Sequence, residues 1–90
     1  MRASPSLKAR APEEFAVTVF VTNPDGSPID IARIDTADAG VHFDRLYLPE
    51  AHPRRKDYGV DVFDYREAQR ILVENWRGFV AAFDEHHGLP

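Results

Sequence analysis

Apolar residues alternate with polar ones in the first half of the chain and recur every three or four residues in the last third. Residues 15–22 (Phe-Ala-Val-Thr-Val-Phe-Val-Thr) are rich in β-branched and aromatic side chains, which is typical of a strand. The Asn-Pro-Asp-Gly sequence that follows predicts a tight turn, because Pro24 presets φ and Gly26 accepts a positive φ. Residues 28–35 are therefore expected to return as the second strand of a hairpin.

A hairpin closed by this turn has a predictable register, since turn type fixes how the two strands align. A type I turn with a glycine bulge pairs Val21 with Ile29, Val19 with Ile31 and Val17 with Arg33. One face of the hairpin then carries stacked β-branched residues, as expected for a face that is buried against another layer.

Residues 41–48 predict a third strand, which the chain reaches through a loop that contains Gly40. Two registers against the second strand are possible, and they differ by one residue, so they turn opposite faces toward the core. One of them places Arg45 opposite Ile31. The other continues the apolar face and is preferred here, with Leu46 opposite Ile31 and Leu48 opposite Ile29.

The preferred register gathers four polar residues at one end of the predicted buried face. It sets Asp35 opposite His42 and Arg33 opposite Asp44, so both cross-strand pairs are complementary in charge. A histidine beside a carboxylate is a common proton carrier near neutral pH, and an arginine nearby can hold a phosphate or carboxylate. These four residues are the candidate catalytic set. The alternative is a self-neutralising patch that closes the end of the sheet.

The last third of the chain predicts one long helix. Asp64 is the expected N-cap, with Glu67 at the capping-box position, and Gly88 ends the helix at about His87. Residues 49–59 predict a loop and residues 60–62 a short edge strand. One stripe of the helix is apolar and is expected to face the sheet: Ala68, Leu72, Asn75, Trp76, Phe79, Val80 and Phe83, with Ile71 on its flank.

These elements predict an α+β fold, a three- to four-stranded antiparallel β-meander with one long C-terminal α-helix packed on one face. A single helix covers a single face of such a sheet, so the other face is left open. That face is expected to carry an apolar interface made of Phe20, Ile34, Phe43 and Tyr47. The expected partner is a second copy of the chain or a small protein.

Composition and charge add limits to this picture. Residues 1–12 contain two prolines, two serines and three basic residues, and we expect a flexible basic arm before a single domain over 13–90. The chain has no cysteine, which suits a cytoplasmic protein, and no apolar run long enough for a membrane span. Its net charge of −4 disfavours non-specific binding to nucleic acid.

Two further groups of residues could carry chemistry. Arg54, Arg55 and Lys56 form a basic run in the predicted loop and could contact phosphates, although no aromatic ladder along the sequence indicates base stacking. His42 and Asp44 have the spacing of two metal ligands on one strand face. No further histidine is placed to complete a site with Asp35, so we expect no metal and no other cofactor.

The run Ile-Ala-Arg-Ile-Asp-Thr-Ala-Asp-Ala-Gly-Val-His-Phe-Asp-Arg (residues 31–45) resembles short prokaryotic proteins with an Arg-x-Asp strand end, a glycine-containing loop and a histidine-rich strand. This group is similar to TumE-type toxin components of toxin–antitoxin modules. Those proteins tend to have His-x-His on the third strand, where this chain has His42 and Asp44. The resemblance implies a role beside a partner protein encoded in the same small operon.

The sequence thus favours a non-enzymatic cytoplasmic module that dimerises or binds a partner. The alternative is a toxin-like, RNA-directed hydrolase with Arg33, His42, Asp44 and Arg45 at its site. A third hypothesis is a DNA-associated protein that uses the basic arm and the basic loop.

Overall fold

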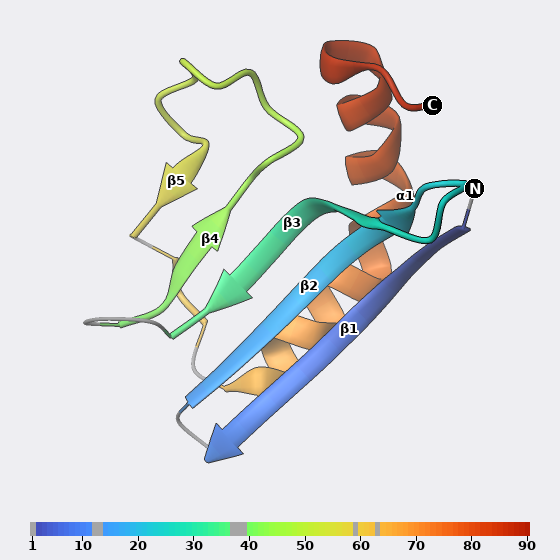
Figure 1. Ribbon diagram of the computed structural model, residues 1–90. Coiled ribbons are helices and arrows are strands. Elements are labelled where there is room, and N and C mark those ends of the chain that lie inside the picture. Colours follow the sequence, from blue (N-terminus) through green and yellow to red (C-terminus); the bar gives the residue numbers. More distant parts are fainter. Residues whose placement is uncertain (1, 12–13, 37–39, 59, 63) are drawn as a thin grey trace.

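The computed structural model describes residues 2–11, 14–36, 40–58, 60–62 and 64–90. The five strands form one antiparallel sheet in the order β1-β2-β3-β4-β5, and the single helix packs against it (Figure 1). The predicted α+β fold is confirmed. The elements are β1 (Arg2–Ala11), β2 (Glu14–Thr22), β3 (Pro28–Asp35), β4 (His42–Asp44), β5 (Lys56–Asp57) and α1 (Tyr65–His87).

Strand β1 replaces the flexible arm that the sequence predicted. It pairs with β2 from Arg2 opposite Thr22 to Ala11 opposite Glu14, with one irregularity near its end. The composition of this segment argued against packing, but a strand needs only a neighbour with unpaired backbone groups. The free edge of β2 is such a neighbour, since its N–H and C=O groups otherwise lack partners.

The hairpin of β2 and β3 follows the predicted register only near its turn. Val21 lies opposite Ile29 as expected, but a β-bulge then leaves Ile31 without a directly opposed residue. The predicted pairs beyond that point are wrong, and the observed pairs are Phe20 with Asp30, Val19 with Ala32 and Val17 with Ile34. A bulge adds one residue to one strand, so the faces of β3 beyond it are exchanged relative to the prediction.

The third strand is shorter than predicted. β4 ends at Asp44, and the chain then turns, with the Leu48 N–H donating to the Arg45 carbonyl at 3.0 Å. Leu46 and Leu48 therefore make no strand pairs with β3. Residues 60–62 were expected to form an edge strand, but they are not a strand in the structure. Strand β4 pairs instead with the two-residue β5.

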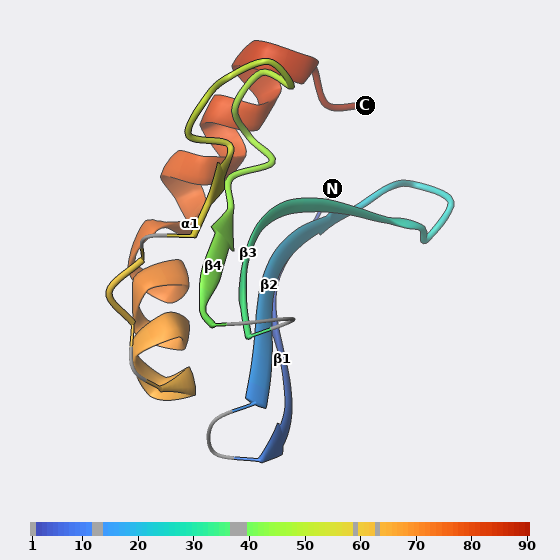
Figure 2. The ribbon, with the colours of Figure 1, turned by 90° about the vertical axis from the view of Figure 1, so that its left-hand side faces the viewer.

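Helix α1 has the bounds that the sequence predicted. The Asp64 carboxylate accepts a hydrogen bond from the Glu67 N–H at 2.9 Å, and Gly88, at φ 77°, donates to the Asp84 carbonyl at 3.0 Å. The helix lies against one side of the sheet (Figure 2). Within the described part of the chain, no helix combines the length and the apolar character needed to cross a membrane.

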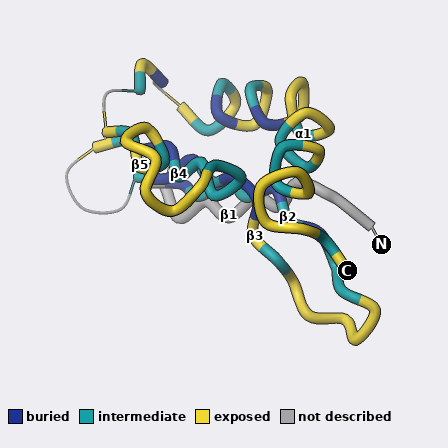
Figure 3. The backbone as a smooth tube through the Cα atoms, turned by 90° about the horizontal axis from the view of Figure 1, so that it is seen from above, coloured by how far each residue is buried: buried dark blue, intermediate teal, exposed yellow. Residues whose placement is uncertain are grey.

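The core lies between α1 and the side of the sheet that we call the inner face (Figure 3). Because of the bulge, this face includes Ile34 and Phe43. The Phe43 ring lies 6.0 Å from that of Phe79 in α1, edge to face, and Tyr47 stacks on Phe79 at 4.7 Å. The fully buried side chains of greatest volume are Ile31, Ile34, Leu72, Val17, Val19 and Val21.

The interface predicted from the sequence is therefore wrong for three of its four residues. Ile34 is fully buried, Phe43 is 5% exposed, and Tyr47 packs on the helix, so none of them lies on the open side of the sheet. Phe20 is half-buried and lies on β2 between the inward-facing Val19 and Val21. The exchange of faces beyond the bulge accounts for the error at Ile34.

Candidate acid-base site

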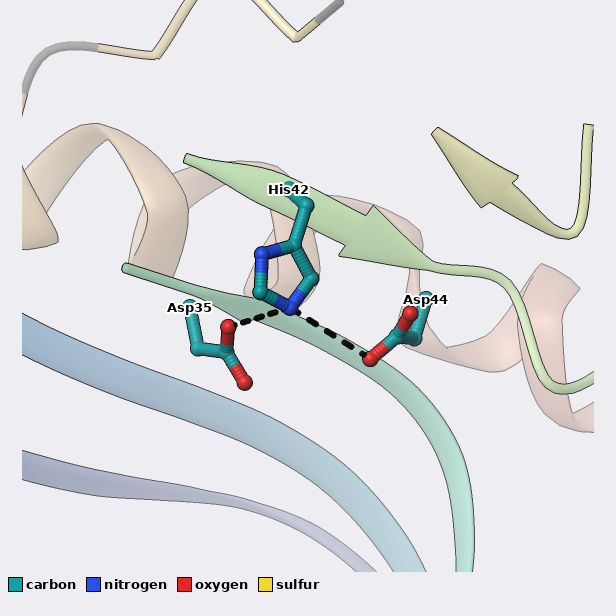
Figure 4. Close-up of side chains that lie close together, drawn as sticks. All are labelled: Asp35, His42 and Asp44. Carbon is teal, nitrogen blue, oxygen red and sulfur yellow. Dashed lines mark ion pairs between the residues drawn. The ribbon is translucent and has the colours of Figure 1, made fainter. Parts of the chain in front are cut away.

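Four ionisable side chains lie together on the side of the sheet away from α1, which we call the outer face. Arg33 is opposite Asp44 and Asp35 is opposite His42, as predicted. We call these four residues the charged cluster. We expected them beneath the helix, but each alternates with a residue that faces α1, so they point the other way. Figure 4 shows three of them, Asp35, His42 and Asp44.

Asp35 links the two other charged groups at this end of the sheet. One carboxylate oxygen lies 2.6 Å from Arg33 Nε, and the other lies 2.6 Å from His42 Nε2. The carboxyl group is 5% exposed, whereas the Arg33 side chain is 42% exposed. The Arg33 contact is an ion pair without good hydrogen-bond alignment at Nε. Asp35 is thus compensated in the interior, and Arg33 still faces solvent.

His42 is buried and makes its closest polar contact through one nitrogen. Nε2 faces Asp35, with an Asp44 oxygen farther away at 3.8 Å. Nδ1 is buried and has no hydrogen-bond partner within the described residues. A neutral imidazole that donates Nε2–H to Asp35 keeps its lone pair on Nδ1. The pair therefore has the arrangement of a general base whose second nitrogen is oriented by a carboxylate.

Strand β5 brings two residues to the cluster that the sequence did not connect with it. Lys56 is opposite Asp44, and the Tyr58 ring lies 5.5 Å from the His42 ring. A hydrogen bond with Tyr58, then the charges of Tyr58 and Asp44, raise the pKa of Lys56 above its usual range. Lys56 thus remains a cation at neutral pH. The two prolines before this segment favoured a loop, so no strand pairing was predicted here.

The segment that ends with Arg54, Arg55 and Lys56, which we call the basic loop, is held in place next to the cluster. The Arg55 Nε donates to the Leu48 carbonyl at 3.3 Å, and the Arg45 N–H donates to the Arg55 carbonyl at 2.6 Å. His87 of α1 also contacts the Leu48 carbonyl, at 3.0 Å. Arg54 is exposed, Arg55 is half-buried and Lys56 is exposed. The three residues predicted to contact nucleic acid therefore stand beside the cluster, with two of them open to solvent.

Arg45 does not belong to the charged cluster, although the RNA-directed hypothesis placed it there. Its guanidinium donates to Asp57 at 2.9 Å and lies 4.3 Å from the centre of the Phe43 ring. Both contacts are on the inner face. Arg45 thus stabilises the strand pair β4–β5 and the edge of the core.

An open hollow of about 380 Å³ adjoins the cluster at its β5 end. Asp44 and Lys56 line it together with residues of the basic loop, among them His52, Arg55 and Glu50. It therefore connects the cluster to the exposed side of the loop. Leu46 and Pro53 also line the hollow, so a ligand there would meet both polar and apolar side chains.

Three side chains of the cluster could hold a divalent cation. Asp35, His42 and Asp44 each offer one ligand atom, and these atoms lie within 4.8 Å of one another. One imidazole and two carboxylates suit several divalent metals. The Arg33 guanidinium occupies an oxygen of Asp35, however, and a cation would have to compete with it.

Comparison with known proteins places the chain in one family. It matches a domain of unknown function (DUF7718) over residues 1–89, and it therefore belongs to that family. No curated protein and no solved structure matches the chain. What the site does has to be inferred from its geometry.

Proposed function

We propose that the protein is a toxin-like, RNA-directed enzyme that cleaves phosphodiester bonds at the charged cluster. The observation that carries this proposal is the contact between the buried Asp35 carboxylate and His42 Nε2, which leaves Nδ1 unpartnered among the described residues. Two solvent-facing cations lie in the same cluster: Arg33, which pairs with Asp35, and Lys56, which is opposite Asp44. A base with two cations nearby is suited to a substrate that is an anion and loses a proton.

RNA supplies both features in one molecule, because a 2′-hydroxyl lies next to each phosphate. In the proposed step His42 Nδ1 takes the proton of the 2′-hydroxyl, and the 2′ oxygen attacks phosphorus. The bond from phosphorus to the 5′ oxygen breaks, and that oxygen takes a proton from water. The hydroxide that remains takes the proton from His42, which restores the base. The products are a 2′,3′-cyclic phosphate and a free 5′-hydroxyl end, and no oxidant or cofactor is needed.

The remaining residues of the site have supporting roles in this step. Arg33 and Lys56 contact the non-bridging oxygens, where negative charge increases in the transition state. Asp35 orients the imidazole and stabilises the imidazolium that forms. Because His42 is only 5% exposed, the hydroxyl has to enter beside Tyr58, the exposed neighbour of its ring.

The resemblance to toxin components of toxin–antitoxin modules supports the same proposal and implies a protein partner in the cytoplasm. The sequence had favoured a non-enzymatic module that binds through an apolar outer face. Three of the four residues named for that face are in the core, whereas the cluster residues did come together. We therefore base the function on the cluster.

The proposal is tested with purified protein and a single-stranded oligoribonucleotide labelled at its 5′ end. We expect cleavage products that end in a cyclic phosphate, and we expect His42→Gln to lower the rate by about 10²–10⁴-fold. Expression of the wild-type protein should arrest growth, and the same substitution should relieve the arrest. Thermal unfolding of the variant establishes whether it remains folded.

One control variant and one further site variant sharpen this test. His86→Gln changes an exposed histidine at the end of α1 and should leave the rate unchanged. Lys56→Gln changes an exposed cation of the site and should lower the rate without unfolding the protein. Absence of cleavage by the wild-type protein, or full activity of His42→Gln, would contradict the proposal.

A further inference from the structure

Tyr58 is a large aromatic side chain in an unusual position. Its relative exposure is 66%, the higher of the two values among the exposed large apolar residues of the described chain. Its ring is nevertheless held on two sides: the His42 ring lies 5.5 Å away, and Lys56 Nζ lies 5.7 Å from its centre. A ring that is fixed by its neighbours and open to solvent is ready to receive another flat group.

Such a platform could not be predicted from the sequence, because Tyr58 and Tyr65 flank the basic run but form no aromatic ladder along it. The contact depends on β5 pairing with β4, which places Tyr58 beside a histidine that is 16 positions earlier in the chain. The arrangement joins an aromatic face, a cation and a basic loop within one surface. These are the components with which proteins bind single-stranded nucleic acid.

We propose that Tyr58 is the residue of the site on which a base of the substrate stacks. This role restricts the substrate to single-stranded RNA. This inference rests on the proposed function and adds the substrate class to it. A base stacked on Tyr58 places its own phosphate near Lys56, while the neighbouring nucleotides follow the hollow toward His52 and Arg55. Bases in a duplex are stacked on one another, so they cannot stack on this ring.

The polar neighbours of the hollow fit a nucleic-acid backbone better than an apolar ligand. Lys56 is an exposed cation at neutral pH, and Arg54 is exposed next to it. The carboxylate of Asp44, opposite Lys56, and that of Glu50 limit how many phosphates can lie here. We therefore expect a short binding site of a few nucleotides.

Binding can be measured separately from cleavage with a 2′-O-methylated oligoribonucleotide, which lacks the attacking hydroxyl. A fluorescently labelled probe of about a dozen nucleotides is suitable for titration by anisotropy. We expect Tyr58→Ala and Tyr58→Leu to weaken binding by about tenfold, since stacking of one base has that order of effect. Tyr58→Phe keeps the aromatic face and should bind nearly as the wild type does.

An abasic oligomer with the same number of phosphates is the matched control probe. It should bind the wild-type protein and Tyr58→Ala equally, because only the base meets the ring. A duplex of the same sequence should bind more weakly than the single strand. Lys56→Gln should weaken binding to the base-bearing and the abasic probe alike.

The outcomes separate the two proposals. If Tyr58→Ala and Tyr58→Leu bind the base-bearing probe as the wild type does, while cleavage still depends on His42, the stacking role is wrong and the proposed function stands. If the wild-type protein binds no single-stranded probe at low salt, both are overturned. Equal losses on the base-bearing and abasic probes would also overturn the stacking role.

Discussion

The two faces of the sheet are made from the same strands and differ in nearly every physical respect. On the inner face Ile34 and Phe43 are opposite each other and are buried against α1. One residue along, Asp35 and His42 are also opposite each other and also buried, but they are charged or polar and face away from the helix. Adjacent residues thus serve the core and the candidate site.

The difference shows that burial alone does not identify a core. Apolar side chains on the inner face gain free energy when they leave water. The Asp35 carboxylate loses hydration and is compensated by its ion pair with Arg33 and its contact with His42. A protein keeps such groups at a cost in stability, which is a reason to expect a function at the outer face.

The largest effect on stability is expected from the inner face. Ile34→Ala removes a fully buried side chain and should lower the free energy of unfolding by about 2–5 kcal/mol. Thr18→Ala, on the outer face of the neighbouring β2, should change it by less than about 0.5 kcal/mol. Urea unfolding of both variants measures the contrast. Equal effects would mean that the two faces are not distinct.

The next effect concerns the compensated charges of the outer face. A double-mutant cycle with Asp35→Asn and His42→Gln should give a coupling of about 0.5–3 kcal/mol, because the two side chains are in direct contact. As a control, Asp25→Asn in the exposed β2–β3 turn should be additive with His42→Gln. Additivity of Asp35→Asn and His42→Gln would show that their contact contributes nothing.

A smaller effect is expected at the start of the helix that covers the inner face. Asp64→Ala removes the side chain that accepts from the Glu67 N–H, and should cost about 1 kcal/mol. Asp61→Ala changes an exposed acid before the helix and should cost much less. Thermal unfolding of the two variants compares them, and equal shifts in midpoint would contradict a specific capping role.

The smallest effect is a pH dependence that arises at the edge of the inner face. Burial raises the pKa of Tyr47 above its ordinary value of 10.0, although Arg45 opposes this shift. The folded state therefore favours the protonated phenol. Its contribution to stability is complete below pH 10.0 and is lost as the pH rises through the higher folded pKa.

Tyr47→Phe should make the alkaline loss of stability less steep. Urea unfolding at neutral pH and at alkaline pH measures the slope for the wild type and the variant. Identical slopes would show that Tyr47 does not titrate differently in the folded and unfolded states.

The sequence predicted well those parts that depend on local chemistry. The bounds of α1 follow from the Asp64 cap and Gly88, and the pairing of Asp35 with His42 follows from complementary charge. The sequence-based predictions failed where the pairing between strands decided the structure. A residue's propensity does not reveal the bulge at Ile31 or the pairing of Lys56 with Asp44.

By itself, then, the sequence determined the hairpin strands β2 and β3, the C-terminal helix and which polar residues meet across β3 and β4. It did not determine the length of β4 or the existence of β1 and β5. Only the tertiary structure decided which face of the sheet each group occupies. One extra residue in a strand exchanges its faces, and no local signal in the chain records that insertion. For the same reason the charged cluster lies on the outer face beside Tyr58, with Asp35 and His42 buried and Arg33 facing solvent, and is not covered by the helix.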